Sequence, residues 1–110
     1  MANAIERWRD LIGPRSLDEY LAQHFGDTSR YRISRRTYRP RENTAGAMIG
    51  GLCFVMRGRC RYSFKAAEFD LKDGDYCTLP RGNYSLTALG DDECATVTVF
   101  EIPLQELRGE

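Results

Sequence analysis

The stretch covering residues 74–85 constrains the fold of this chain more than any other. It opens with the turn pair Gly74-Asp75, because glycine tolerates positive φ and aspartate can bond its own backbone. Residues 76–79 then alternate with the period of a half-buried strand. Pro80 ends that strand because it has no N–H donor, and Gly82 allows the chain to reverse. The stretch predicts two short strands joined by tight turns.

Short runs of the same kind extend through most of the chain. We expect strands at residues 30–39, 52–56, 59–64, 69–71, 76–79, 84–89 and 95–102. Residues 40–47 contain proline, asparagine and glycine, so we expect a loop there. Many short strands separated by glycine-rich turns predict a mainly β protein, built as an antiparallel β-barrel or jelly roll.

Two short helices are expected before the first strand. Apolar residues recur at helical spacing over residues 3–12. Ser16 and Glu19 have the spacing of a capping box for a second helix, which Gly26 ends. Helices this short are unstable alone, so we expect them to cover an open end or an edge of the barrel.

The length of 110 residues suits one domain. We expect an N-terminal helical segment at 1–28, the β-barrel at 29–104 and a tail at 105–110. The formal net charge of zero argues against nucleic acid and anionic membranes as partners. Neither a membrane-spanning apolar run nor a signal-peptide pattern is visible, so we expect a cytoplasmic protein.

Residues 74–85 resemble the second sequence motif of the cupin superfamily. That motif is a glycine, five residues and Pro-x-Gly, followed in metal-binding members by a histidine three residues later. Ser85 stands in the place of that histidine. The resemblance covers roughly residues 31–102 and implies a cupin-like antiparallel β-barrel.

The first cupin motif is similar to this chain only in its last part, the apolar strand that leads to Gly58. Counting back from Gly58 places the two histidines and the glutamate of the family on side chains that cannot bind a metal. These are Thr44 and Gly46, or Ala45 and Ala47 with the shorter spacing, and Gly51. With Ser85 in the fourth place, the resemblance implies no metal and no other cofactor.

Cysteine and histidine are the remaining candidate metal ligands. They are Cys53, Cys60, Cys77, Cys94 and His24. The first three cysteines fall on apolar strand positions, which favours core packing. The alternative is that two or three of them line the barrel cavity as soft metal ligands. One histidine cannot build a metal site by itself, and we expect His24 to be an exposed or half-buried helix residue without a catalytic role.

Arginine accounts for fourteen of the sixteen basic residues. A guanidinium suits carboxylate or phosphate, so the arginines indicate an anionic ligand or an acidic partner surface, or else a solvated strand face paired with the acids of the chain. Arg35 lies on the same face of its strand as Tyr31 and Ile33, so it is a candidate to point into the barrel. There it could pair with Glu101, or both could face a polar cavity.

These arguments place a candidate cavity within the barrel. We expect it to be lined near Arg35, Cys53, Tyr62, Ser85, Thr87 and Glu101. Ser85 stands where the family has an inward ligand, and Thr87 shares its face. The competing outcome is a collapsed barrel filled by aromatic side chains, with Arg35 outside in water.

We therefore expect a metal-free cupin-like module that binds a small polar or anionic ligand or a protein partner. The alternative is a metal-independent isomerase or lyase that uses Tyr, Arg and Glu side chains, with Tyr62, Tyr84, Arg35 and Glu101 as the acid–base and orienting groups. A third hypothesis, nucleic-acid binding through the arginine-rich strand, is opposed by the zero net charge. We expect a homodimer, because residues 52–56 are apolar on both faces.

Overall fold

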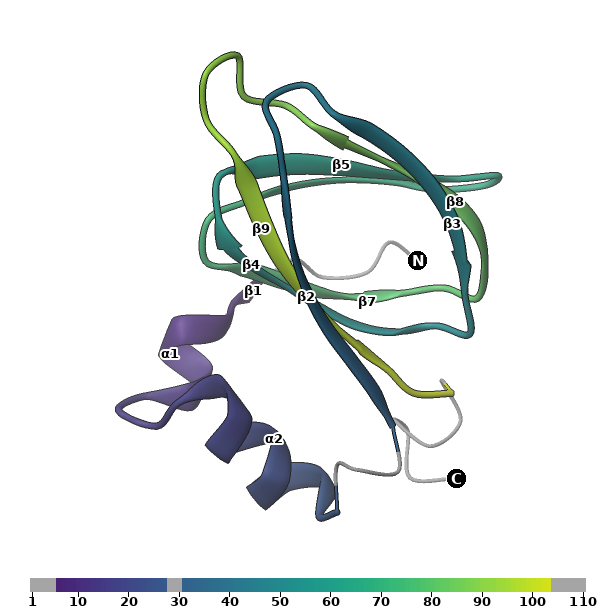
Figure 1. Ribbon diagram of the computed structural model, residues 1–110. Coiled ribbons are helices and arrows are strands. Elements are labelled where there is room, and N and C mark those ends of the chain that lie inside the picture. The colour runs from purple at the N-terminus through teal and green to yellow at the C-terminus, as the bar shows by residue number, and fades with distance from the viewer. Residues whose placement is uncertain (1–5, 28–30, 104–110) are drawn as a thin grey trace.

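The computed structural model describes residues 6–27 and 31–103, which form two antiparallel sheets and two helices (Figure 1). The first sheet has the order β1 (Glu6–Arg7), β7 (Asp75–Leu79), β4 (Gly51–Arg57), β9 (Ala95–Glu101) and β2 (Arg32–Tyr38). The second has the order β3 (Asn43–Met48), β8 (Gly82–Ala88), β5 (Arg59–Phe64) and β6 (Glu68–Lys72). The prediction of a mainly β barrel or jelly roll with two short N-terminal helices is confirmed.

The two sheets face each other across a barrel core. Its buried residues include Cys53, Val55, Tyr62, Leu86 and Val97. They come from alternate positions of their strands, because successive side chains of a strand point to opposite faces. The inner face of every central strand is thus filled by apolar and aromatic side chains.

The two helices are α1 (Trp8–Ile12) and α2 (Leu17–Phe25). The capping box before α2 is present as predicted, since the Ser16 hydroxyl accepts from the Glu19 N–H and the Glu19 carboxylate accepts from the Ser16 N–H, both at 3.1 Å. The first helix is shorter than expected, because β1 precedes it and pairs with β7. Neither helix is long and apolar enough to cross a membrane.

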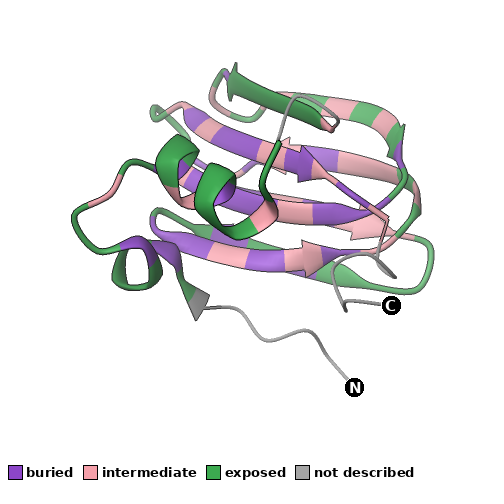
Figure 2. Cartoon of the chain, turned by 90° about the horizontal axis from the view of Figure 1, so that it is seen from below, coloured by how far each residue is buried: buried purple, intermediate pink, exposed green. Residues whose placement is uncertain are grey.

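The helices pack on the outer face of the first sheet, so the expectation that they cover an end or an edge of the barrel was wrong (Figure 2). They enclose a second core, the helix core, around Trp8, Leu21, Phe54 and Phe100. The Trp8 indole N–H donates to the Val55 carbonyl at 2.8 Å, which fastens α1 to β4. The helices therefore cover the apolar outer face of β4, the feature that suggested a homodimer, and the homodimer stays a prediction.

Residues 40–47 are not the loop that their composition suggested, because most of them belong to β3. This strand pairs with β8 along its whole length, from Asn43 opposite Thr87 to Met48 opposite Gly82. Small residues within it are tolerated because β8 supplies the large side chains of this region. The tail expected at 105–110 lies outside the described residues.

Candidate functional site

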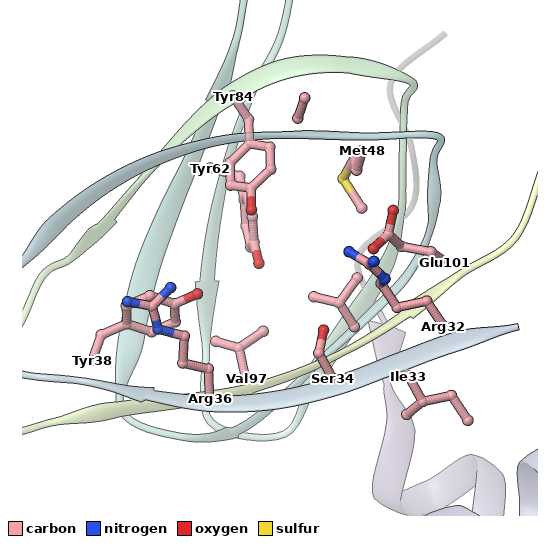
Figure 3. A pocket seen from close by; sticks show the side chains of 12 residues that line it. Arg32, Ile33, Ser34, Arg36, Tyr38, Met48, Tyr62, Tyr84, Val97 and Glu101 are labelled. Carbon is pink, nitrogen blue, oxygen red and sulfur yellow. The ribbon is translucent and has the colours of Figure 1, made fainter.

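A cavity of about 460 Å³ opens between β2 and β3, the strands at one edge of each sheet (Figure 3). Its apolar and aromatic wall is formed by Tyr38, Met48, Tyr62, Tyr84, Val97 and Val99. Polar side chains of β2 and of the last residue of β9 also line the cavity, namely Arg32, Ser34, Arg36 and Glu101. The three residues from β2 are exposed, so the cavity is open to solvent beside that strand.

Strand β2 positions its polar side chains by alternation. Tyr38 is buried in the barrel core, and residues two, four and six positions before it share its face. Those residues are Ser34 and the two arginines, Arg32 and Arg36. Ile33, from the opposite phase, also borders the cavity, and Figure 3 shows its side chain extending from the other side of β2, toward the helices.

Three tyrosines give the wall both apolar surface and hydroxyl groups. The rings of Tyr62 and Tyr84 lie 5.3 Å apart between centroids. Burial raises the pKa of Tyr62 and of Tyr38, so both phenols stay protonated near neutral pH. Tyr62 lies next to the Cys53 thiol and lowers the pKa of that thiol, against the larger effect of burial. Two of the three phenols therefore act as neutral polar groups and not as bases.

The charged groups of the lining differ in how they are partnered. The Arg36 guanidinium lies 3.8 Å from the Glu42 carboxylate and 5.0 Å from the centroid of the Tyr38 ring. Arg32, by contrast, has no carboxylate within 4.0 Å among residues 6–27 and 31–103. Arg32 is thus the cation at the cavity mouth that is left without a partner in the described chain.

Glu101 lies directly opposite Arg32 in the β2–β9 pairing. Its side chain is half-buried, and one carboxylate oxygen accepts from the Ile49 N–H at 3.4 Å. Figure 3 shows the side chains of Arg32 and Glu101 extending into the same part of the cavity mouth. A cation and an anion therefore stand side by side at one end of the cavity.

Of the six residues predicted from sequence to line a cavity, Tyr62 and Glu101 do so. Arg35 does not, and its predicted inward direction was wrong. Its Nε donates to the Thr98 hydroxyl at 2.7 Å, and its guanidinium lies 3.9 Å from the Asp18 carboxylate of α2. Arg35 points outward because Tyr31 and Ile33, which share its phase, face the helix side of the sheet.

Ser85 and Thr87 also lie outside the cavity lining. The inward positions of β8 are Tyr84, Leu86 and Ala88, which belong to or pack against the barrel core. Thr87 instead accepts a hydrogen bond from the Asn43 side-chain amide at 2.7 Å on the outer face. The apolar residues of β8 thus take the inward face, and Ser85 faces outward although the motif places an inward ligand at its position. Cys53, the sixth residue, is fully buried beneath the wall.

The positions that the cupin motifs assign to metal ligands do not fit a metal. The Tyr84 ring lies against Gly46, where an added Cβ would come within 2.8 Å of the tyrosine hydroxyl. An added Cβ at Gly51 would come within 2.9 Å of the Glu101 Cα and collide with the backbone of β9. Thr44 offers only a hydroxyl, and Ser85 faces outward.

The cysteines do not supply a substitute ligand set. Burial raises the pKa of Cys60 and Cys77 to about 12 and that of Cys53 well above its usual range, so all three are protonated thiols in the core. No three potential ligands from His, Cys, Asp and Glu gather anywhere in the described chain.

The cavity predicted from sequence left out several lining residues, namely Arg32, Ser34, Arg36 and Tyr38, and Tyr84 was named only for the metal-independent enzyme. Tyr38 could have identified the inner face of β2, because a large aromatic side chain near the end of a strand favours the buried face. The residues in phase with Tyr38 then include Arg32, Ser34 and Arg36. Tyr84 shares its phase with Leu86, and that pair would have identified the inner face of β8.

Comparison with known proteins finds similarity in structure and not in sequence. No protein-family model matches the chain, and no curated protein matches it. A cupin protein from Bacteroides fragilis aligns with 93% of this chain and 76% of its own length, at a TM-score of 0.56 and 8% identity. A cupin superfamily protein from Desulfitobacterium hafniense DCB-2 aligns over 66% of this chain and 68% of its own, at a TM-score of 0.52 and 15% identity.

A de novo designed double-stranded β-helix is also similar, at a TM-score of 0.53 and 14% identity. The alignment covers 64% of this chain and 99% of the designed one. Similarity at such low identity establishes the fold, and the fold alone hosts many unrelated functions. The chain has the double-stranded β-helix fold of the cupin superfamily.

Proposed function

We propose that this chain is a cupin-like module that binds a small organic anion, without a metal, in the cavity between β2 and β3. The observation that carries the proposal is Arg32, an exposed cation at the cavity mouth with no carboxylate within 4.0 Å in the described residues. A guanidinium presents a rigid fork of donors that suits a carboxylate or phosphate group. A bound anion would give Arg32 the partner that the described chain does not provide.

The wall behind Arg32 favours an organic ligand over an inorganic ion. It consists largely of tyrosine, methionine and valine side chains. Small-molecule sites in proteins have this character, with mostly apolar walls and a few polar groups that orient the ligand. The volume of about 460 Å³ falls within the usual range for such sites. A concave site of this size suits a small molecule better than a folded protein partner.

A metal-independent enzyme is the second candidate, because Tyr62, Tyr84 and Glu101 line one cavity. Burial raises the pKa of Tyr62, which opposes a role for this phenol as a base. Glu101 is the carboxylate available for proton transfer in that lining, and it lies at the mouth. Binding without chemistry therefore accounts for more of the lining than catalysis does.

The experiment measures binding of 3-phenylpropionate and related small carboxylates to the chain by titration calorimetry. Arg32→Gln should weaken binding roughly 10- to 100-fold, the usual effect of losing a hydrogen-bonded charge. Arg59→Gln is the matched control, since Arg59 is an exposed strand arginine outside the cavity lining. Equal affinity in both variants, or no binding of any carboxylate, would overturn the proposal.

A further inference from the structure

We infer that the cavity selects ligands that carry an ammonium group next to the carboxylate, as free α-amino acids with an apolar or aromatic side chain do. This inference rests on the proposed function, because it names the ligand class of the same site. It arises from Arg32 and Glu101, a cation and an anion that stand side by side at one end of the cavity.

The backbone pairing places these two side chains together. Residues directly opposite in an antiparallel pair have their Cβ atoms about 5 Å apart, so both side chains rise from neighbouring points of one face. Even so, the guanidinium and the carboxylate come no closer than 4.0 Å, since no ion pair joins Arg32 to an acid within the described residues. The Ile49 N–H occupies one carboxylate oxygen of Glu101, at 3.4 Å. The other oxygen has no hydrogen-bond donor in the described chain.

An α-amino acid matches this arrangement in charge and in spacing. One carbon separates its ammonium nitrogen from its carboxylate carbon. The carboxylate can therefore accept from Arg32 while the ammonium donates to Glu101. The head group and the pair of side chains each carry zero net charge, so no charge remains unbalanced in the complex. A phosphate dianion fits less well, because Glu101 would repel it.

The rest of the cavity accounts for the remainder of the ligand. Met48, Val97 and Val99 line the cavity between the charged end and the tyrosines, and they offer apolar contact to a side chain. Arg36 lies four residues from Arg32 along β2, about 13 Å at the usual rise per strand residue, so it cannot share the same head group. Its ion pair with Glu42 and its position over the Tyr38 ring leave it as part of the wall.

A direct Arg32–Glu101 ion pair is the competing arrangement, in which the two residues satisfy each other. It predicts no preference for an ammonium group. Exposed ion pairs between long side chains are weak, so a ligand that replaces the pair with two charge-assisted contacts would win the competition.

The test compares three probes that differ in one group each: L-phenylalanine, 3-phenylpropionate without the ammonium, and 2-phenylethylamine without the carboxylate. Titration calorimetry on the full chain at pH 7 should give L-phenylalanine the highest affinity, roughly tenfold or more above either analogue. The unaltered chain therefore provides a readout that needs no variant to fold.

Glu101→Gln then tests the named residue. The variant should bind L-phenylalanine roughly tenfold or more weakly, while 3-phenylpropionate should bind as well as before or better, because an opposing charge has been removed. Glu93→Gln is the matched control, since Glu93 is an exposed acid beyond the other end of β9. Circular dichroism would verify that each variant keeps its strands.

The outcomes separate this inference from the function on which it rests. If 3-phenylpropionate binds through Arg32 as tightly as L-phenylalanine, or if Glu101→Gln weakens both equally, the ammonium site is refuted and the anion site stands. If Arg32→Gln leaves the binding of every probe unchanged, or none of them binds, both are refuted.

Discussion

Replacing Gly51 with alanine should destabilise the protein strongly, because the first residue of β4 is held against the backbone of β9. Gly51 has φ +153°, a value that side-chain-bearing residues rarely adopt. A Cβ there would lie 2.9 Å from the Glu101 Cα and closer still to the Phe100 carbonyl. Neither group is the movable end of a side chain, so one of the two strands has to shift.

A matched substitution separates the two costs. Gly82 has a similar φ of +144°, but an added Cβ there meets nothing within 4 Å. Gly82→Ala therefore measures backbone strain alone, about 1–3 kcal/mol. Gly51→Ala should add about 1–3 kcal/mol for overpacking against a central strand. A domain with a total stability of about 5–15 kcal/mol would lose a large share of it.

The assay is urea unfolding followed by the fluorescence of Trp8, the single tryptophan. This residue is buried in the helix core, so its emission should shift to longer wavelength as the chain unfolds. With unchanged slopes, the midpoint of Gly51→Ala should lie well below that of Gly82→Ala. Equal midpoints would show that β9 yields without cost and would refute the steric argument.

Three further predictions concern Trp8 and the cysteines. Trp8→Phe removes the hydrogen bond to the Val55 carbonyl and should lower the free energy of unfolding by about 1–2 kcal/mol, measured by thermal circular dichroism. Because that carbonyl still accepts from the Gly74 N–H at 2.9 Å, a loss above about 4 kcal/mol would contradict the reasoning. Burial raises the pKa of Cys60 and Cys77 to about 12, so the folded state holds these protons more tightly than the unfolded state. Stability from these thiols should be complete below about pH 8.5 and be lost as the pH rises toward 12, which urea unfolding across that range would test. An aromatic disulfide reagent at pH 8 should reach only the half-buried Cys94 until the chain unfolds, and fast reaction of more than one thiol would contradict this.

Most of the fold could be predicted from local patterns, because alternation and turn residues act over a few positions. The capping box at Ser16 and Glu19 and the strands from 52 onward are of this kind. Strand β3 could not be predicted so, since its small residues have low strand propensity. It exists because β8 provides both the hydrogen bonds and the large side chains that cover it.

The candidate site was harder to predict, because β2 carries side chains of mixed character on both faces. Tyr31 and Ile33 mark one face as apolar, and the natural inference is that this face lies inside the barrel. The helices overturn that inference by making the outside of the first sheet a second interior. The Arg35 side chain lies on the face of β2 that is turned toward the helices, whereas Arg32 and Arg36 lie on the opposite face and line the cavity. Local alternation identifies two faces but cannot say which of two cores each one joins.

Burial of β4 on both faces affects how the pairing register of this strand is fixed. A strand with one wet face is kept in register because a slip of one residue would expose its apolar side chains. Strand β4 lacks that safeguard, since Phe54 and Val55 would remain buried after exchanging cores. Close backbone packing fixes the register of β4 instead of a difference in exposure between its two faces. Gly51 and Gly58, at either end of the strand, approach β9 so closely that an added Cβ would lie within about 3 Å of an opposing Cα. A shifted register would place a residue with a side chain at one of these two close contacts and would clash with β9. The two glycines therefore select the native pairing over a shifted one that hydrophobicity alone would allow.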